Sequence, residues 1–332
     1  MLRFFLIPKN FLPSGKKIKL KIRKNPTMNE QLCITKWHED ENKWWDRYSN
    51  IMAYQWKLTP FLNRIIRQDL ERDFIDYLVK PGGRLLDLGC GSGWLSLKFS
   101  RNDMHVLGLD FSKAQINAAE KMKINMRLKN VKFECVDLMQ WDYQAHTERF
   151  DSIFVNAFLH HLPAEEVKRV FGMISKVIKP GGRVYIYEPL KSSCEKRNLF
   201  LFFIDTLILK CIGLMLGKIP VWFSLRDRSF KKELDEGYNS LSPHEAPLGI
   251  REVKNYCLDS LHMLEVRGWH LYSLGFAMQT MFFKKRIRRI YHPMVFLFYW
   301  IDQIFFRLFG WERFSVKQRF ILCGMKLEKP KI

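Results

Sequence analysis

The sequence feature that most restricts the fold is a short apolar run that stops at three alternating glycines. It is the segment LLDLGCGSGW at Leu85–Trp94, and a helix is expected directly after it, at Trp94–Arg101. Glycine lets the backbone turn sharply and lets a ligand approach without interference from a Cβ atom. The first turn of a helix has unpaired N–H groups that suit a carboxylate or a phosphate. The loop therefore predicts a ligand site, although a glycine loop alone does not distinguish one nucleotide-like ligand from another.

Strands and helices alternate along the next hundred residues. Short apolar runs predict strands at Arg84–Leu88, His105–Leu109, Val131–Val136, Phe150–Val155 and Arg183–Tyr187, the last after a turn at Lys179–Gly182. Ser112 is expected to cap a helix that continues to about Arg127. Alternation of this kind requires crossover connections, so it predicts a parallel sheet with helices on both faces.

The alternation stops after Pro189. A long apolar stretch follows at Leu199–Gly217, and a further helix is expected at Arg251–Ser260. Strands are expected at Met263–Ser273 and Val316–Lys326, on either side of a basic cluster and an apolar-aromatic stretch, Met294–Trp311. The chain is therefore expected to divide into a basic tail (1–29), N-terminal helices (30–80), an α/β core (81–190), an apolar and loop insertion (191–250) and a closing region (251–332) with an amphipathic insertion at 275–314.

Charge and cysteine usage restrict the partners and the compartment. The net charge is +21, with basic clusters at Lys16–Lys24 and Lys284–Arg289, which favours anionic partners such as nucleic acid or a membrane surface. The seven cysteines are scattered and form no C-x-x-C pair, which predicts free thiols in a reducing compartment and no metal site. Pro8 and Pro13 interrupt the N-terminal apolar stretch, so a signal peptide is not expected. A loosely ordered tail that touches a membrane is preferred to a transit peptide, and a cytoplasmic location is expected, peripheral at the inner face of a membrane.

Acidic residues follow three of the predicted strands. Asp87 lies two residues before the first glycine, and Asp110 ends the second strand, where an acid can hold ribose hydroxyls. Asp137 follows the third strand, where it could accept from an adenine amino group, although a simple helix cap explains it as well. The loop reads G-C-G-S-G, which differs from the dinucleotide pattern G-x-G-x-x-G.

Together these motifs resemble class I S-adenosylmethionine-dependent methyltransferases, in their small-molecule and lipid branch. The resemblance rests on the loop Asp87–Gly93, on Asp110, on Val136–Leu138 and on Lys179–Gly182. It implies a Rossmann-like α/β fold whose seven-stranded, mostly parallel sheet ends in an antiparallel strand, with the last two predicted strands as a closing hairpin. It also implies S-adenosyl-L-methionine as methyl donor. The implied donor-binding residues are Asp87, Gly89, Cys90, Gly91, Gly93, Asp110, Phe111, Asp137, Leu138 and Asn156.

Methyl transfer is an in-line displacement at the sulfonium carbon. An acceptor that attacks through a hydroxyl group would need a base to remove its proton. His160 and His161, just past the fourth strand, are the first candidates, with a structural role as the alternative. His244, beside Glu245 on a loop that resembles a D-E-H-P-L segment of bacterial members in altered order, is the second. Glu188 is expected to touch substrate or to close a turn. Trp44 and Tyr48 are candidates to close over the donor, and core packing is the alternative for Trp44.

The two apolar stretches favour a small or lipid-like hydrophobic acceptor at a membrane surface. Met294–Trp311 suits a helix that lies in an interface, beside the basic cluster at Lys284–Arg289. The alternative is that both stretches pack together as a cap over the site. An RNA methyltransferase is a rival interpretation, but the fourth strand ends in Asn156-Ala157-Phe158 and not in the N-P-P-Y type that holds a flipped base. A non-catalytic donor-binding scaffold is a second rival. The acceptor, the atom methylated and the oligomeric state stay open.

Overall fold

A computed structural model describes residues 34–46, 60–191, 203–204, 207–208, 246–257, 260–273, 276–277, 285–314 and 321–331. A helix covers residues 34–46. The other α-helices are α2 (Pro60–Leu78), α3 (Trp94–Ser100), α4 (Lys113–Met126), α5 (Ala164–Val177), α9 (Ile250–Cys257) and α11 (Lys285–Phe309). The strands are β1 (Arg84–Leu88), β2 (His105–Asp110), β3 (Val131–Cys135), β4 (Phe150–Asn156), β5 (Ile178–Lys191), β6 (Leu248–Gly249), β7 (His262–His270) and β8 (Ile321–Glu328). Short 3-10 helices are η2 (Tyr143–His146), η3 (Leu159–His161) and η4 (Trp311–Arg313).

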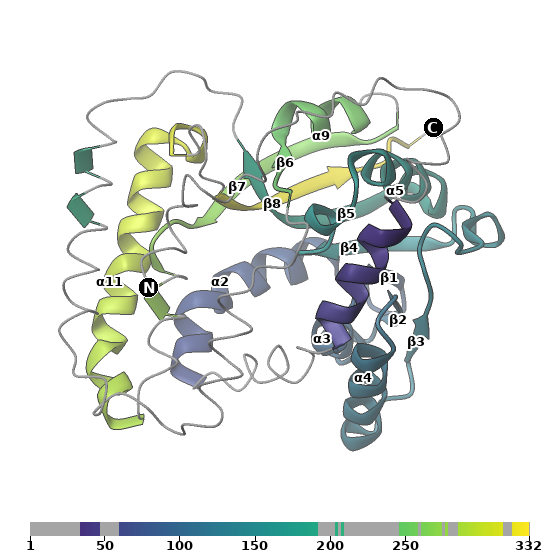
Figure 1. Cartoon of the computed structure of the whole chain (residues 1–332), viewed down its shortest axis with the longest axis horizontal. Helices are drawn as coiled ribbons and strands as arrows, with labels where there is room; N and C mark the ends of the chain where they lie inside the picture. The colour runs from purple at the N-terminus through teal and green to yellow at the C-terminus, as the bar shows by residue number, and fades with distance from the viewer. Residues whose placement is uncertain are drawn as a thin grey trace.

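One twisted sheet runs through the molecule in the strand order β3-β2-β1-β4-β5-β8-β7, with the two-residue β6 paired to β5 (Figure 1). Strands β1 to β5 pair in parallel, and β8 is antiparallel to both β5 and β7. This arrangement confirms the predicted Rossmann-like α/β fold with an antiparallel last strand. It also confirms that the two late strands are antiparallel neighbours, although α11 lies between them in the sequence.

Side chains of the central strands alternate between two apolar layers, as the period of two in a strand requires. Leu85, Phe154 and Tyr185 belong to the layer that includes α2, α3 and α4. Leu86 and Val155 belong to the opposite layer, which includes α5 and α9. The sheet is therefore buried on both faces, which leaves the ends of its strands accessible to a ligand.

From β1 to β4 the predicted boundaries agree with the structure to within one residue, and larger differences occur at β5 and in the C-terminal helices and strands. Ser112 caps α4 as predicted, with its Oγ accepting from the Gln115 N–H at 3.3 Å. Lys179–Gly182 does not form a separate turn, because β5 already begins at Ile178 and passes through an irregularity opposite β4. The seventh strand ends at His270, three residues earlier than predicted.

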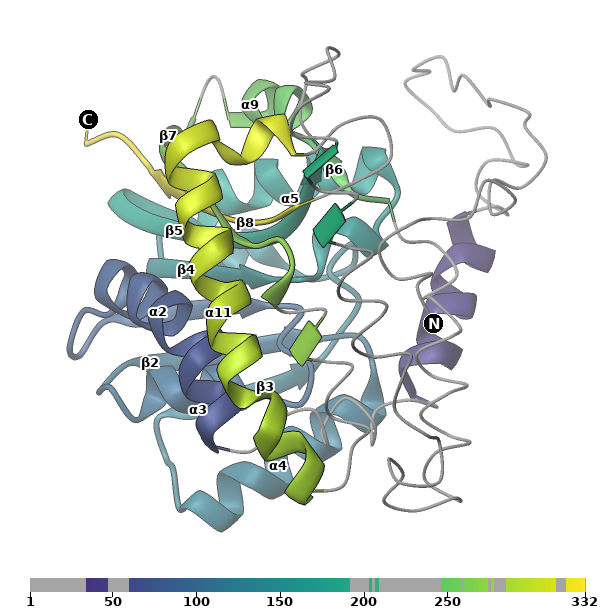
Figure 2. The same cartoon turned by 90° about the vertical axis from the view of Figure 1, so that its left-hand side faces the viewer.

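The long helix α11 lies along the outside of the molecule beside α2 (Figure 2). Within the described residues, no helix is long and apolar enough to cross a membrane. The basic tail and the predicted stretch Leu199–Gly217 lie wholly or mostly outside those residues, as do Tyr48, His244 and Glu245. The proposed division of the chain into domains stays a prediction.

Candidate functional site

A cavity of about 370 Å³ lies at the carboxyl edge of the sheet. Its lining residues follow the strand order, from Asp137 after β3 to Leu322 at the start of β8. Such edges are where open α/β sheets bind ligands, and the volume is in the range of small-molecule sites. The cavity therefore extends along the sheet edge, with one end near β3 and the other near β8.

The three glycines of the loop have different structural roles. Gly89, Gly91 and Gly93 all have left-handed backbones, with φ of 67°, 53° and 75°. A Cβ atom on Gly89 would lie 2.5 Å from the Phe158 ring, and one on Gly93 would lie 2.5 Å from the Phe133 ring. A Cβ on Gly91 would meet nothing nearer than Gln115 Oε1 at 3.9 Å. Gly89 and Gly93 are thus required for packing, and Gly91 leaves its backbone open to the cavity.

Two buried carboxylates flank Gly91. Asp110 Oδ2 accepts the Gly91 N–H at 2.8 Å, and Asp110 Oδ1 accepts the Ser112 N–H at 2.9 Å. Burial raises the pKa of Asp110 to about 6 despite these hydrogen bonds. Burial also raises the pKa of Asp87 to about 7, against a hydrogen bond from the Ser96 hydroxyl that lowers it. Two carboxylates in one dry site favour a ligand that carries positive charge.

Gln115 adds a polar group to the same end of the cavity. Its side chain is buried, and its Oε1 atom has no hydrogen-bond partner among the described residues. An unpaired buried amide oxygen costs free energy unless a ligand or water donates to it. Gln115 is therefore placed to accept a hydroxyl or an ammonium N–H from a ligand beside Gly91.

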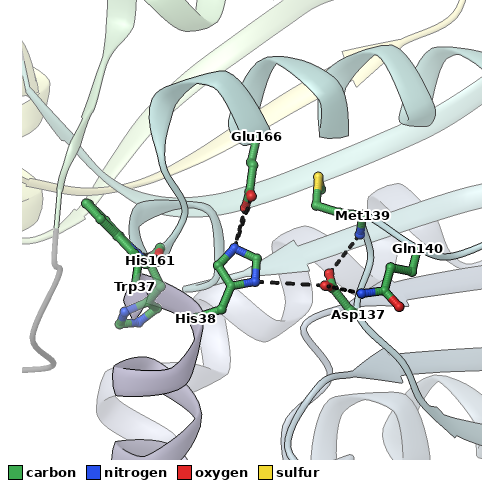
Figure 3. A network of polar contacts seen from close by, with 7 residues as sticks. All are labelled: Trp37, His38, Asp137, Met139, Gln140, His161 and Glu166. Carbon is green, nitrogen blue, oxygen red and sulfur yellow. Dashed lines mark hydrogen bonds and ion pairs between the residues drawn. The ribbon is translucent and has the colours of Figure 1, made fainter. Parts of the chain in front are cut away.

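Asp137 lies in the polar network of Figure 3. Its Oδ1 accepts the Met139 N–H at 2.9 Å, as in a local turn, and its Oδ2 lies 3.9 Å from His38 Nδ1. His38 Nε2 lies 2.8 Å from Glu166 Oε2 on the first turn of α5. The hydrogen bond with Glu166 raises the pKa of His38 above its usual value, with burial opposing it. No helix begins directly after Asp137, so the carboxylate closes a local turn and does not cap a helix, and the side chain also faces the cavity.

The helix at residues 34–46 forms the wall of the cavity opposite the sheet edge. Trp37 Nε1 donates to the backbone oxygen of His161 at 2.7 Å, and Asp46 Oδ1 accepts from the Ser112 hydroxyl at 2.5 Å. The ring of Trp45 meets the His161 ring edge-on, with centroids 5.1 Å apart. These contacts fasten the helix to the loops that follow β2 and β4, so residues far from the glycine loop in sequence complete the site.

The end of β4 carries a strained backbone. Ala157 has φ of 50°, and its N–H donates to the Tyr187 carbonyl at 2.8 Å. A non-glycine residue in the left-handed region costs about 1 kcal/mol or more and is typical of functional sites. Ala157 and its neighbour Asn156 both line the cavity. The strained turn therefore forms part of the cavity wall, between the ends near β3 and β8.

Glu188 and His160 form a buried pair beneath that turn. Glu188 Oε1 accepts the Phe158 and Leu159 N–H groups at 2.6 and 2.7 Å, and Glu188 Oε2 lies 2.7 Å from His160 Nδ1. Neither side chain lines the cavity. Of the two roles expected for Glu188, the geometry matches closing a turn, and it matches the structural alternative for His160.

The far half of the cavity is mostly apolar. Its lining includes Arg67, Leu70, Glu71 and Phe74 of α2, Trp94, Tyr187, and His270, Ala277 and Leu322 near the antiparallel strands. The Arg67 guanidinium lies 5.9 Å from the centre of the Trp94 ring. This half is suited to an apolar molecule with a small polar group.

Most of the predicted site residues meet at this cavity. Its lining includes Asp87, Gly89, Cys90, Gly91, Asp110, Phe111, Asp137, Leu138, Asn156 and His161, whereas Gly93 and His160 lie behind it. Trp44 is not among the lining residues, but its neighbour Trp45 is. Sequence reasoning missed the lining residues of α2, which no motif marks, and also Trp37, His38 and Gln115. Among the described residues no group of three or more His, Cys, Asp or Glu side chains is placed to hold a metal ion.

Comparisons with known proteins agree with this geometry. Residues 79–211 match the family model of a methyltransferase domain. The chain is 26% identical to phosphoethanolamine N-methyltransferase 1 of Triticum aestivum over 45% of this chain and 30% of that protein. It is 29% identical to the ubiquinone biosynthesis O-methyltransferase of Hahella chejuensis over 48% of this chain and 62% of that protein. The chain thus spans less than two thirds of the length of these relatives.

Among solved structures, phosphoethanolamine N-methyltransferase 2 of Haemonchus contortus in complex with S-adenosyl-L-methionine is similar, with a TM-score of 0.49 and 13% identity over 80% of this chain and 53% of that chain. The family match covers β1 to β5, the part of the chain that builds the glycine loop. Residues 79–211 therefore form a class I S-adenosylmethionine-dependent methyltransferase domain.

Proposed function

We propose that this protein transfers a methyl group from S-adenosylmethionine to a small, hydrophobic or lipid-like acceptor at a membrane surface. The observation that carries the proposal is the placement of Asp87 and Asp110 beside the open backbone of Gly91, at one end of a cavity whose other end is apolar. A cationic, polar donor fits the first end, and a hydrophobic acceptor fits the second.

The residues present fit the donor chemically. When bound, S-adenosylmethionine supplies a methyl group activated by a positively charged sulfonium. Asp110 is the acceptor for ribose hydroxyls, and Asp137 the acceptor for an adenine amino group. Asp87 and Gln115 face the remaining polar part, where an ammonium group would offset the buried negative charge of Asp87. The cavity contacts of Cys90, Phe111, Leu138 and Asn156 make them the nonionic part of the same donor site.

The protein's contribution to methyl transfer is alignment and exclusion of water. Holding two reactants in line can contribute about 7–11 kcal/mol relative to a reaction in solution. The helix at 34–46 covers the donor end, and the ring walls of Phe74, Trp94 and Tyr187 enclose the acceptor end. Attack by a neutral or anionic nucleophile on the sulfonium methyl disperses charge, so a dry apolar wall favours the transition state.

His161 is the residue placed to remove a proton from a hydroxyl acceptor. It lines the cavity, and its Nδ1 lies 3.4 Å from Glu41 Oε2, which orients the ring. An acid that orients a histidine is a common arrangement for a general base. If the acceptor reacts through nitrogen or carbon, His161 would only position the acceptor. His160 serves the turn through Glu188, and His244 lies outside the described residues.

The relatives support a small acceptor. Their names specify N-methylation of phosphoethanolamine in one case and O-methylation in ubiquinone biosynthesis in the other. The apolar half of the cavity favours an acceptor of the second kind, with a hydrophobic body. Such molecules reside in bilayers, and this supports our proposal of a cytoplasmic enzyme that is peripheral at the inner face of a membrane.

The test is to incubate the purified protein with donor labelled at the methyl carbon, together with total lipid extract or with total RNA. Label in the lipid fraction supports the proposal, and it should be lost in Asp110→Asn. Asp151→Asn is the matched control, because Asp151 pairs with Lys80 and Lys179 away from the cavity. Label in RNA would identify a nucleic-acid methyltransferase, and tight donor binding without transfer to either fraction would identify a scaffold.

A further inference from the structure

The outer face of α11 is an exposed apolar stripe. It consists of Ile290, Phe296, Leu297, Trp300, Ile304 and Leu308, whose side chains are 48% to 72% exposed. Their spacing places all six on one side of the helix. The stripe is about 27 Å long, since a helix rises 1.5 Å per residue. Contiguous exposed apolar surface of this size marks an interaction site.

The inner face of the same helix already accounts for its packing on the protein. Val295, Phe298 and Tyr299 are buried against the core, and Asp302 is fully buried. A helix with apolar side chains on two opposite faces is normally covered on both of them. The outer stripe of α11 therefore requires a partner that the core does not supply.

Charge on α11 selects the kind of partner. Its sequence holds five basic residues and a single acidic residue, Asp302, which points inward. Arg289 and Arg307 are exposed near the two ends of the stripe. A second copy packed on this face would bring arginines from both copies into one apolar interface, whereas the headgroups of anionic lipids would pair with them. A stripe of Trp, Phe, Leu and Ile with arginines beside it is typical of a helix that lies in a bilayer interface.

We infer that the outer face of α11 docks on an anionic lipid bilayer, with the helix lying flat in the interface. The inference rests on the proposed function in placing the protein at a membrane. It goes further by naming the contact surface, its lipid class and its connection to the cavity. The helix does not cross the bilayer, since no described helix is long and apolar enough to do so.

The helix also holds the acceptor end of the cavity. Asp302 accepts the N–H groups of Leu271, Tyr272 and Ser273 at 3.0, 2.8 and 3.0 Å. These residues follow His270, which lines the cavity. On the other side, the Tyr299 hydroxyl donates to Asp69 of α2, the helix that contributes Arg67, Leu70 and Phe74 to the cavity wall. Docking α11 on a bilayer thus brings the apolar half of the cavity close to the lipid.

The experiment is co-sedimentation of the full chain with two kinds of vesicle. One is phosphatidylcholine alone, and the other contains about 30% phosphatidylglycerol, an anionic lipid. The anionic vesicles should bind the protein at least about tenfold more tightly, and raised salt should weaken the binding. The variant Leu297→Ser/Trp300→Ser/Ile304→Ser should lose about tenfold or more of that affinity. The control is Ile124→Ser on α4, which removes an apolar side chain that is even more exposed and lies away from the stripe.

Equal binding of the triple variant and the wild type would overturn the inference, and so would the absence of vesicle binding by the wild type. A change in oligomeric state of the triple variant, with vesicle binding intact, would show that the face joins copies of the chain, and would also overturn it. Circular dichroism and donor binding verify that the variant folds. Vesicle binding is measured without methyl transfer, so its failure leaves the proposed reaction intact, and loss of transfer with binding retained counts only against the proposed function.

Discussion

His38 Nε2 lies 2.8 Å from Glu166 Oε2, and this contact joins the wall helix at 34–46 to the first turn of α5 across 128 residues of sequence (Figure 3). Glu166 is almost fully buried, and His38 also faces Asp137. The wall of the cavity is therefore attached through a histidine whose pKa is raised, chiefly by this contact.

His38→Ala should loosen the wall helix. The pKa of His38 is raised, chiefly by its hydrogen bond with Glu166. The contribution of this contact is thus fully present below the usual histidine pKa and is lost as pH rises through the raised pKa. Hydrogen exchange of residues 34–46 should be about fivefold faster in His38→Ala at low pH, and the difference should shrink as pH rises. Glu39→Gln, on the exposed side of the same helix, is the control. Equal exchange in His38→Ala and wild type across this range would contradict the prediction.

Donor affinity should rise with pH between about 5 and 8. Asp110 has a pKa of about 6 and Asp87 a pKa of about 7, both raised by burial, so both lose a proton in this window. A positively charged donor binds best to the ionised forms. Without donor the sign is opposite, because groups with raised pKa values stabilise the fold least at high pH. The rise in melting temperature on adding donor should therefore be larger at pH 8 than at pH 5.5.

Calorimetric titration of acid-to-amide variants tests whether the donor-site carboxylates cause this pH dependence. Asp110→Asn should weaken donor binding by about 10- to 100-fold, the worth of a charged hydrogen bond, and should flatten the pH dependence. Asp151→Asn should leave donor affinity unchanged, because Asp151 lies at the other end of the sheet with Lys80 and Lys179. Donor binding that is independent of pH in the wild type would refute the assignment of Asp87 and Asp110 to the donor site.

Alanine at Gly91 and at Gly93 should have different consequences. Both positions have positive φ, which costs alanine about 1 kcal/mol. Gly91→Ala puts a methyl group into open space beside the cavity, so donor affinity should fall more than stability. Gly93→Ala drives a methyl group against Phe133 and Ala119, so the free energy of unfolding should fall by about 1–3 kcal/mol more. Urea unfolding and donor titration of both variants distinguish the two roles. The reverse order of effects would show that Gly93 is the residue nearest the ligand.

Substitutions of the two adjacent histidines should have different effects on turnover and stability. With a hydroxyl acceptor, His161→Gln should lower the turnover rate by about 100-fold or more and remove the acidic limb of the pH profile. His160→Gln should retain most of the turnover, because glutamine can still donate to Glu188, and should mainly lower the melting temperature. Should His160→Gln alone abolish transfer while the fold is intact, His160 and not His161 would be the base.

The local pattern of the sequence was sufficient to predict the strands and the glycine loop. Five apolar runs alternating with helices admit few arrangements other than a doubly covered parallel sheet, and Ser112 as a helix cap needs only its nearest neighbours. The acids at the ends of β1 and β2 and after β3 were predictable for the same reason, since parallel strands bring their carboxyl ends to one edge. The bounds of β5 were less accessible, because the pairing partner and not the local sequence decides that the strand includes Lys179–Gly182.

The residues at the acceptor end of the cavity were not predictable from local sequence, because contacts between distant segments bring them together. Nothing local marks Arg67, His270 or His38 as cavity residues; they meet only because α2, β7 and the helix at 34–46 pack around one sheet edge. The assignment of His160 to Glu188 and of His161 to the cavity also followed from the fold, since the centroids of the two rings lie only 4.0 Å apart and only their surroundings distinguish them. The sequence by itself determined the fold class and the chemistry of the donor end, because short-range patterns encode both. Only the tertiary structure decided which side chains enclose the cavity and which face of α11 stays open, because long-range packing sets both.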